Sequence, residues 1–323
     1  MQIKSSVLVI GAGFVGSSLG TVFAEKGLDV WSWDISGKVA NGCRDPRSLT
    51  SSRFLALTTS DVVRLIQHHD PGFSGIAFAC VPTPMFEDGE ADLSIVESVL
   101  DELSKASEPV IAVVKSTVPP GSTEFWNTKF EGTGLTVCFS PEHLREASSL
   151  EDQRNQDRIV IGGPRPQVDQ VRDIFRMAFP EVPIIKTSSV NAELTKYVIN
   201  TFLASKVSYA NEIYQLCEAL AARGDDVDYD RVIEIATLDK RLGTSHWKVP
   251  GPMPSDDDKH ELRRGWSGSC FAKDVNALLY LMKDLGVNPQ MLQAAWDKNL
   301  EVRPERDWEK LIGRAVSKKK DAA

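Results

Sequence analysis

A glycine-rich turn near the start of the chain constrains the fold more than any other feature. Ser6 to Ile10 is a continuous apolar run that favours a β-strand, and it leads into Gly11-Ala-Gly-Phe-Val-Gly16 and a helical pattern through Lys26. Asp29 to Asp34 then reads as a second strand with an acid at its carboxyl end. Strand, glycine turn, helix and strand in this order predict a dinucleotide-binding unit.

Each glycine of this turn has a mechanical role in such a unit. Gly11 permits the tight turn, Gly13 lets the backbone approach the pyrophosphate, and Gly16 lets the helix pack closely on the sheet. Asp34 is placed to accept hydrogen bonds from a ribose and to repel a 2′-phosphate, which favours NAD over NADP. The expected cofactor contacts in this region are Gly11, Gly13, Phe14, Val15, Gly16, Asp34 and Lys38.

Strand-like runs continue to alternate with helical patterns through the first half of the chain. Strands are predicted at 75–80, 109–115, 135–140 and 158–162, and a helix at 93–106. This alternation predicts an α/β fold with a Rossmann-like doubly wound parallel sheet, whose ligands bind beyond the carboxyl ends of the strands. Polar residues follow three of these ends: Thr83, then Lys115, Ser116 and Thr117, then Glu142, His143, Arg145 and Glu146. One such cluster would be explained by capping, but three at successive strand ends indicate a site.

The second half of the chain is predicted to be helical. One long helix is expected from Asn191 to Arg223, with further helices at 229–237, at 273–285 and from residue 289. We therefore expect a Rossmann domain over residues 1–189 and an all-helical domain over residues 190–323, built on the long helix. Lys196 and Asn200 lie four residues apart on one face of that helix, where a solvated surface pair is the simpler interpretation.

Composition excludes several classes of function. The net charge of −8 gives no field that would attract nucleic acid or anionic lipid. The start of the chain has no apolar signal core, and no run approaches the roughly 20 residues of a membrane span. We therefore expect a cytoplasmic protein that binds neither nucleic acid nor membrane. The widely scattered cysteines argue against a disulfide framework or a metal site, and they are Cys43, Cys80, Cys138, Cys217 and Cys270.

Cys270 has a more reactive-looking neighbourhood than the other cysteines. It lies in the run Gly265-Trp-Ser-Gly-Ser-Cys-Phe-Ala-Lys-Asp274, which reads as a glycine-rich turn beside a lysine and an aspartate. Cys80, Cys138 and Cys217, by contrast, read as small buried hydrophobic residues. Transfer of a single hydride needs no thiol, so Cys270 indicates covalent chemistry.

The chain resembles the UDP-glucose/GDP-mannose dehydrogenase family over nearly its whole length. Besides the glycine turn and Asp34, the motifs that carry this resemblance are Val81-Pro-Thr-Pro84, Lys115-Ser-Thr-Val-Pro-Pro-Gly121, Ser140-Pro-Glu-His-Leu-Arg-Glu146, Arg158-Ile-Val-Ile-Gly162, Ala192-Glu-Leu-Thr-Lys-Tyr197, Asn211-Glu212 and Ser269-Cys-Phe-Ala-Lys-Asp274. The resemblance implies four-electron oxidation of a nucleotide-sugar primary alcohol to a uronic acid, with two NAD and one water consumed. UDP-glucose is the expected substrate and a homodimer the expected assembly.

The resemblance also implies roles for single residues. Cys270 would attack the intermediate aldehyde, and the thiohemiacetal would be oxidised to a thioester that water releases. Lys196 and Asn200 would stabilise the oxyanion, and Asp274 would act with Lys196 in proton transfer or water placement. The water would be positioned by Thr117 and Glu142, and which acid is the base stays open. Expected NAD contacts are Thr83, Ser116, Glu146 and Lys273, and expected contacts of the nucleotide sugar are Glu142, Lys196, Asn200, Lys206, Asn211, Arg263, Arg264 and Gly268.

Three residues depart from the family pattern. Ser140 stands where asparagine is usual, Ser267 where the first of two glycines is usual, and Ala272 where proline is usual. If the backbone at Ser267 has a positive φ, serine costs about 1 kcal/mol or more there.

The chain also ends soon after the helix that begins near Pro289, whereas most members of the family continue into a second nucleotide-binding-like domain. We therefore expect a short form without that domain. One hypothesis is that residues 246–264 replace part of the missing pocket wall, with Arg263 and Arg264 facing the diphosphate. The alternative is a solvated loop.

Two other functions stay open. In a two-electron dehydrogenase of the hydroxyacid type, Lys196 would be the general acid and base, and Cys270 would only pack. In a catalytically silent NAD-binding protein, neither residue would have a chemical role.

Overall fold

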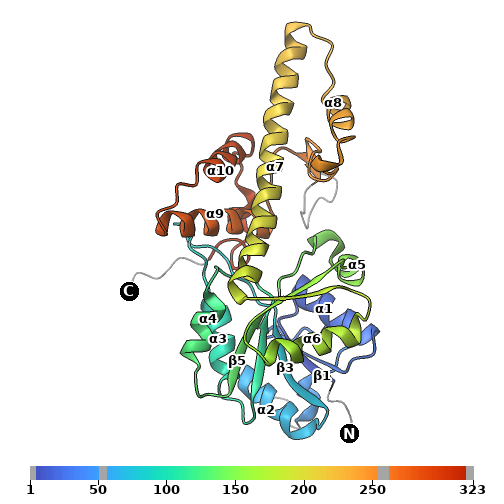
Figure 1. Ribbon diagram of the computed structural model, residues 1–323, viewed down its shortest axis with the longest axis vertical. Coiled ribbons are helices and arrows are strands. Elements are labelled where there is room, and N and C mark those ends of the chain that lie inside the picture. Colours follow the sequence, from blue (N-terminus) through green and yellow to red (C-terminus); the bar gives the residue numbers. More distant parts are fainter. Residues whose placement is uncertain (1–4, 51–56, 253–261, 318–323) are drawn as a thin grey trace. The chain divides into compact units, whose positions relative to one another are not determined.

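The computed structural model describes residues 5–50, 57–252 and 262–317, which form two compact units (Figure 1). The first, here called the sheet unit, comprises Met1–Thr83 and Leu93–Lys196, and the second, the helical unit, comprises Pro84–Asp92 and Tyr197–Ala323. One continuous helix, α7 (Ser189–Arg223), contributes to both. The domain boundary between residues 189 and 190 therefore stays a proposal.

The sheet unit contains a seven-stranded sheet in the order β2-β1-β3-β4-β5-β6-β7. The strands are β1 (Ser6–Ile10), β2 (Val30–Trp33), β3 (Phe73–Ala79), β4 (Val110–Val114), β5 (Leu135–Phe139), β6 (Ile159–Gly162) and β7 (Ile184–Thr187). Strands β1 to β5 are parallel, β6 runs antiparallel to β5, and β7 is parallel to β6. The predicted Rossmann-like sheet is confirmed. The reversed pair was not predicted, because a short apolar run reads the same in either direction.

Helices cover both faces of this sheet (Figure 1). One face is covered by α2 (Thr59–His69), α3 (Ser94–Leu103) and α4 (Ser122–Lys129), the other by α1 (Phe14–Glu25) and α6 (Gln167–Ala178), and α5 (Ser149–Arg154) contacts α1. In β1, Leu8 and Ile10 belong to the first core while Val7 and Val9 belong to the second, and all four are buried. A strand buried on both faces is a continuous apolar run, which is why β1 was recognisable.

The helical unit is organised around α7. Ala204 packs with Trp266 and with α9 (Gly268–Asp284) and α10 (Gln290–Val302). Further along the helix, Ala210 packs with Trp247 and with Tyr229 of α8 (Tyr229–Ala236). The unit also holds a short antiparallel pair, β8 (Gly251–Pro252) and β9 (Leu262–Arg263). In the parts of the chain that the structure describes, no helix is both long and apolar enough to cross a bilayer.

A carboxylate from the first turns of α7 caps α4 inside the sheet unit. Glu193 is fully buried and accepts hydrogen bonds from Gly121 N at 2.6 Å, from Thr123 N at 2.9 Å and from Thr123 Oγ1 at 2.6 Å. Gly121 is the N-cap residue of α4 and has a φ of +97°, which favours glycine. As a glycine, it has no side-chain oxygen that could cap the helix. Glu193 therefore supplies the oxygen acceptor that a helix amino terminus requires and fixes the start of α7 against the loop after β4.

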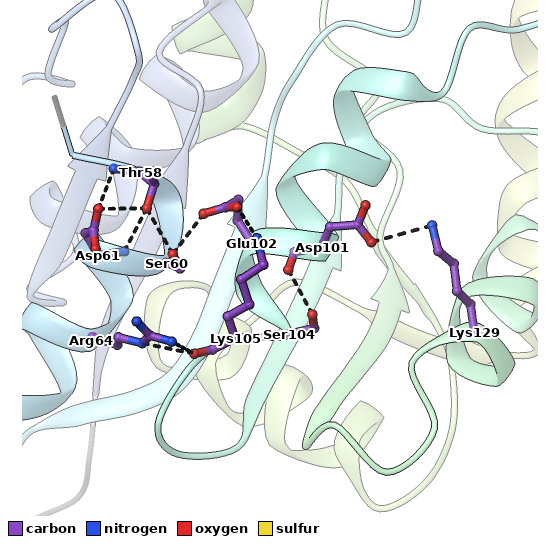
Figure 2. Close-up of polar contacts among 9 residues, drawn as sticks. All are labelled: Thr58, Ser60, Asp61, Arg64, Asp101, Glu102, Ser104, Lys105 and Lys129. Carbon is purple, nitrogen blue, oxygen red and sulfur yellow. Dashed lines mark hydrogen bonds and ion pairs between the residues drawn. The ribbon is translucent and has the colours of Figure 1, made fainter.

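Polar contacts join α2 to α3 and, separately, α3 to α4 through Asp101 and Lys129 in the same unit (Figure 2). Thr58 and Asp61 form a capping box at the start of α2. From the same turn, Ser60 Oγ donates to Glu102 Oε2 at 2.8 Å, and Lys105 Nζ donates to Glu102 Oε1. The hydrogen bonds from Lys105 and Ser60 hold the pKa of Glu102 down, from 4.5 to about 2.

Replacing Glu193 with alanine should destabilise the protein strongly. The substitution leaves three donors at the start of α4 without an acceptor, of which the two on Thr123 are buried, so we expect the free energy of unfolding to fall by about 3 kcal/mol. The free energy can be measured by urea denaturation. Glu124→Ala is the matched control, because Glu124 lies in the first turn of the same helix but is exposed. If both variants lose only a few tenths of a kcal/mol in the free energy of unfolding, Glu193 does not act as the cap of α4.

Glu102→Gln should lower stability at pH 7 by about 1 kcal/mol, because the Lys105 partner is half exposed and the ion pair is partly screened. The folded pKa of Glu102 lies below the unfolded one, so its contribution is present above pH 4.5 and is lost as the pH falls towards 2. Unfolding curves of the two proteins should therefore converge over this range. The exposed Glu131→Gln should match the wild type at every pH. A difference that persists at pH 2 would contradict the assignment.

Candidate functional site

The glycine turn between β1 and α1 cannot carry side chains at two of its three glycines. Gly11 has a φ of +92°, and a Cβ there would lie 2.4 Å from the carbonyl oxygen of Cys80. A Cβ on Gly16 would lie 1.8 Å from the carbonyl oxygen of Gly11. At Gly13, by contrast, no heavy atom of the described residues lies within 4 Å of the Cβ position. The space in front of Gly13 fits the close approach of a pyrophosphate, with Phe14 and Val15 opening α1 behind it.

Asp34 follows β2 and lies beside this turn. Its Oδ2 accepts a hydrogen bond from Ala12 N at 2.7 Å, and its Oδ1 accepts one from Ser36 N at 2.8 Å. Burial alone would raise the pKa of Asp34, but the hydrogen bonds from Ala12 and Ser36 outweigh it and lower the pKa. The carboxylate is therefore ionised at neutral pH, as a ribose-binding acceptor must be. The predicted contact Lys38 lies on the exposed loop that follows.

The ends of β3 and β4 are tied together by hydroxyl groups. Thr83 Oγ1 donates to the carbonyl oxygen of Thr117 at 2.8 Å, and Ser116 Oγ donates to that of Val81 at 2.5 Å. Thr83 and Thr117 are both buried. Because β3, β4 and β5 are parallel neighbours, the three predicted polar clusters share one edge of the sheet.

Lys115 ends β4 inside the protein. Its Nζ donates to Ser140 Oγ at 3.3 Å and to the carbonyl oxygen of Pro141 at 3.2 Å. Burial lowers the pKa of Lys115 to about 8. Ser140, which stands where the family usually has asparagine, thus supplies one of the acceptors for this ammonium group.

Lys196 and Glu142 form an ion pair within the sheet unit. Lys196 Nζ lies 2.8 Å from Glu142 Oε1 and 2.6 Å from the Glu142 carbonyl oxygen, and both residues are less than a tenth exposed. Glu142 Oε2 accepts from Leu144 N at 2.6 Å. Burial alone would raise the pKa of Glu142, but the Lys196 ammonium and these hydrogen bonds hold it below its usual value. Lys196 is therefore not a solvated surface residue. Glu146 lies further along the same loop, at the start of a short 3-10 helix.

Cys270 lies in the first turn of α9, not on an irregular turn as the sequence suggested. The glycines around it read as loop residues, but only the residues before Gly268 are non-helical. Cys270 and Asp274 are four residues apart in this helix and therefore share a face. The amino terminus of a helix stabilises a thiolate. The position of Cys270 thus favours a reactive thiol.

Asp274 is almost fully buried in the helical unit, and each of its oxygens is hydrogen bonded. Asn200 Nδ2 donates to Oδ2 at 2.5 Å, and Lys273 Nζ donates to Oδ1 at 2.6 Å. Asn200 comes from α7 and is itself buried. Four predicted site residues, Cys270, Lys273, Asp274 and Asn200, are thus brought together in this unit.

The serine at position 267 carries no backbone strain. Its φ of −152° is extended, and the left-handed conformations of this segment fall on Gly265, with φ +69°, and Gly268, with φ +84°. The cost considered for a serine with positive φ therefore does not arise. Ser267 Oγ donates to Asp307 Oδ1 at 2.7 Å, so the hydroxyl anchors the segment that leads into α9.

Two residues expected to face the nucleotide sugar make contacts within the helical unit. Asn211 is 1% exposed, and its Oδ1 accepts from Gly265 N at 3.1 Å. Lys206 Nζ donates to the carbonyl oxygen of Leu242 at 2.9 Å and lies 4.8 Å from the ring centre of Trp247. Asn211 thus holds the segment before Cys270 in place.

The hypothesis about residues 246–264 falls in part on residues 253–261, which lie outside the described residues. Of the two arginines, Arg263 lies in β9. Arg264 NH2 is 2.5 Å from Glu218 Oε1, and its guanidinium lies 4.8 Å from the ring centre of Tyr214. The charge of Arg264 therefore already has a partner in the helical unit.

Sequence reasoning gave no role to Glu193, although it is buried and connects two parts of the sheet unit. Its position three residues before Lys196, within a motif that carries the family resemblance, was the available signal. The partner at Gly121, 72 residues earlier, has no local pattern that would identify it.

Two family models match the chain. The NAD binding domain of the UDP-glucose/GDP-mannose dehydrogenase family matches residues 5–178, and the central domain of the same family matches residues 190–301. These two matches cover the glycine turn, the Lys196 and Glu142 pair, and the Cys270 segment.

Individual relatives agree with these family models. The UDP-glucose 6-dehydrogenase AglM of Haloferax volcanii is 31% identical over 322 residues, which cover 92% of this chain and 70% of AglM. The UDP-glucose 6-dehydrogenase TuaD of Bacillus subtilis is 30% identical, over 92% of this chain and 63% of TuaD. A solved UDP-glucose dehydrogenase from Pyrobaculum islandicum superposes with a TM-score of 0.71 at 30% identity, over 93% of this chain and 68% of that one. The chain thus spans about two thirds of the length of these relatives.

The motifs, the fold and these matches agree over both units: the chain belongs to the UDP-glucose/GDP-mannose dehydrogenase family, and residues 5–178 are its NAD-binding domain.

Proposed function

We propose that this protein oxidises the primary alcohol of a nucleotide sugar to a uronic acid in two NAD-dependent steps, with UDP-glucose as substrate and Cys270 as the covalent nucleophile. The observation that carries the proposal is the position of Cys270 in the first turn of α9, one turn before a buried and fully hydrogen-bonded Asp274. A simple hydride-transfer enzyme has no use for such a thiol.

The residues of the sheet unit fit NAD. The open space in front of Gly13 suits the pyrophosphate, and the ionised Asp34 carboxylate suits a ribose with free hydroxyls. NAD, when bound there, would supply the hydride acceptor for each of the two oxidations. We assign NAD contacts also to Thr83, Ser116, Glu146 and Lys273.

In the first oxidation, the substrate hydroxyl loses its proton to a base of this chain. The candidate bases are Glu142 and Asp274, both ionisable groups held by lysines at 2.8 Å and 2.6 Å. Lys196 and Asn200 donate hydrogen bonds to the oxygen as negative charge develops on it. Both have amine or amide hydrogens for this, and both are buried, so water competes weakly for them.

In the second oxidation, the Cys270 thiolate adds to the aldehyde carbon. A carbon–sulfur bond forms as the carbonyl π bond opens, and the oxygen takes back the proton that the base accepted in the first oxidation. The carbon of this thiohemiacetal carries both a hydroxyl group and a hydrogen, as the alcohol carbon did. The hydrogen can therefore leave as hydride, which is not possible from the free aldehyde in the same way. Loss of that hydrogen as hydride, and of the hydroxyl proton to the base, leaves a thioester on Cys270.

Water then cleaves the carbon–sulfur bond. Thr117 and Glu142 position the water, and Glu142 takes its proton as the oxygen attacks the thioester carbon. The Cys270 thiolate leaves as the uronic acid forms, and Glu142 releases its proton to the solvent, so the chain returns to its starting state. Glu142 is suited to this role because Lys196 keeps it ionised.

The names of the relatives support UDP-glucose as substrate. We assign contacts with the nucleotide sugar to Glu142, Lys196, Asn200, Lys206, Asn211, Arg263, Arg264 and Gly268. Because Asn211 bonds Gly265, it acts on the substrate through that backbone segment. Arg264 would have to exchange Glu218 for the diphosphate.

The exposed apolar face of α7 supports a homodimer. Val198, Phe202, Tyr209 and Leu216 are each more than half exposed, and the spacing of four, seven and seven residues places them along one side of the helix. An apolar stripe of this length is typical of a helix that packs on another copy. We propose that α7 packs against α7 of a second chain.

Cys270→Ala should abolish complete oxidation. The aldehyde then cannot be bound covalently, so we expect the kcat for uronic acid formation to fall at least about a thousandfold, while the wild type forms two NADH per UDP-glucose. NADH is counted at completion by absorbance. Cys217→Ala is the control, because Cys217 is a buried thiol of the same unit and should leave turnover unchanged.

The same experiment distinguishes the alternative functions. One NADH per substrate, with activity retained in Cys270→Ala, would indicate the two-electron dehydrogenase. Tight NAD binding without turnover of any UDP- or GDP-sugar would indicate a silent binding protein. In a Glu142→Gln variant with slow hydrolysis, mass spectrometry should detect the sugar acyl group on Cys270, and its absence would count against the thioester.

Phe202→Glu should convert the dimer to a monomer, because it places a charge in the middle of the apolar stripe, where burial would leave it unpaired. Analytical ultracentrifugation at micromolar concentration measures the change. Met291→Glu is the control, since Met291 is 86% exposed on α10 and lies off this stripe. If Phe202→Glu sediments like the wild type, α7 is not the interface.

A further inference from the structure

Arg303, at the carboxyl end of α10, is a buried charge to which the proposed chemistry gives no role. Its side chain is fully buried, and it pairs with Asp307 through two hydrogen bonds. Nε donates to Asp307 Oδ1 at 2.7 Å, and NH2 donates to Asp307 Oδ2 at 2.7 Å. Burial alone would raise the pKa of Asp307, but the hydrogen bonds from Arg303 and Ser267 lower it to about 2. The pair is therefore fully charged at neutral pH.

Stability alone does not explain such a pair. Apolar residues of similar volume often replace a buried ion pair without loss of stability, whereas a charged pair fixes the groups around it in one arrangement. The groups that this pair holds are therefore informative. Arg303 NH1 donates to the carbonyl oxygen of Arg264 at 2.9 Å, and Asp307 Oδ1 accepts from Ser267 Oγ at 2.7 Å. Both contacts fall on the segment that leads directly into α9 and Cys270.

Ser267 is the N-cap residue of α9, yet its side chain makes no capping hydrogen bond to the described first turn of this helix. A serine at this position usually accepts a hydrogen bond from the N–H of the second or third helical residue, which here are Ser269 and Cys270. The extended backbone of Ser267 is compatible with such a cap. Its hydroxyl donates to Asp307 instead. The ion pair thus keeps the Ser267 hydroxyl turned away from α9.

We propose that Arg303 and Asp307 are positioning residues for Cys270, and that by holding the Ser267 hydroxyl they leave the first-turn amides of α9 to the Cys270 thiolate. An amide that donates to a serine oxygen stabilises a neighbouring thiolate less, because its hydrogen is already engaged. This inference rests on the proposed function, which makes Cys270 the nucleophile. Where the family usually has glycine this chain has a potential cap, and the pair prevents it from acting as one.

The test measures the reactivity of the Cys270 thiol without substrate. Iodoacetamide alkylates thiolates, and peptide mass spectrometry follows Cys270 alone as the pH is raised. The double variant Arg303→Met with Asp307→Ala leaves no charge of the pair buried alone and frees the Ser267 hydroxyl to cap α9. We expect the pH midpoint of alkylation to rise by about half a unit to one unit, so that alkylation at pH 7 is about three- to tenfold slower.

A third substitution separates this effect from a merely structural one. Adding Ser267→Gly to the double variant removes the hydroxyl that could cap the helix, so the midpoint should return to the wild-type value. Ser267→Gly alone should alkylate like the wild type, because the serine does not cap α9 there either. Asp307→Asn keeps a side-chain oxygen for Arg303 but loses the charge that holds Ser267. It should therefore give a smaller rise of the midpoint.

Lys298→Met with Glu301→Ala is the matched control. These residues form another ion pair on α10, with Lys298 Nζ 2.8 Å from Glu301 Oε2, but the Glu301 side chain is 55% exposed. Its removal should leave the midpoint of Cys270 alkylation unchanged. The charged groups of α9 next to Cys270 are Lys273 and Asp274, which pair with each other at 2.6 Å. They are present in every variant and so do not account for a difference.

Two results would overturn the proposal: a wild-type midpoint in the double variant, or a raised midpoint that Ser267→Gly does not restore. In either case the pair does not act through Ser267. With UDP-glucose as substrate, kcat at pH 7 should fall in the double variant and recover in the triple variant, while the KM for NAD stays unchanged. If the midpoints shift as expected but no nucleotide sugar is oxidised, the proposed function fails and the effect on the thiol stands.

Discussion

The buried ion pair between Lys196 and Glu142 is the interaction on which the sheet unit depends most. Its two charges lie 2.8 Å apart, and each residue is less than a tenth exposed. Two buried charges are tolerated only together, because removing one partner of such a pair costs about 3 to 5 kcal/mol. The pair therefore fixes the loop after β5 to the start of α7, and Glu193, one turn earlier, fixes α7 to the loop after β4. The lysine and the carboxylate to which we assign chemical roles are thus held by the same contacts that hold the fold.

The helical unit holds the proposed nucleophile, Cys270, differently. Cys270 owes its position to the backbone of α9, and Asp274 on the same helix face is fixed by Asn200 and Lys273. Cys270 lies at the amino terminus of a helix, which favours negative charge. The charge of the buried Asp274 carboxylate is paired with Lys273, so no charge is buried without a partner. The two units therefore divide the proposed chemistry: an ionised carboxylate with its lysine in one, a thiol at a helix terminus in the other.

Most of the sheet could be predicted from the sequence, because strands buried on both faces are continuous apolar runs, and the glycine turn has few alternative structures. The long helix was predictable for a similar reason, since its pattern runs unbroken from Asn191 to the glycine that follows Arg223. The helices α2, α4, α5 and α6, strand β7, and the direction of β6 were not predicted. Of these, α2 does have a local signal, the capping box of Thr58 and Asp61 at its start. The direction of β6, by contrast, depends on contacts between distant segments, which leave no local pattern. The burial of Lys196 was missed for the same reason.

The departures from the family pattern show how a motif can vary while its geometry is kept. Glycine is required where φ is positive, and in the Cys270 segment those positions are Gly265 and Gly268. Ser267 lies between them in extended conformation, so a side chain fits there, and its hydroxyl bonds Asp307, which also pairs with the buried Arg303. The serine therefore adds a contact that glycine could not make. A sequence comparison counts this position as a mismatch, but the backbone conformation determines whether the mismatch has a cost.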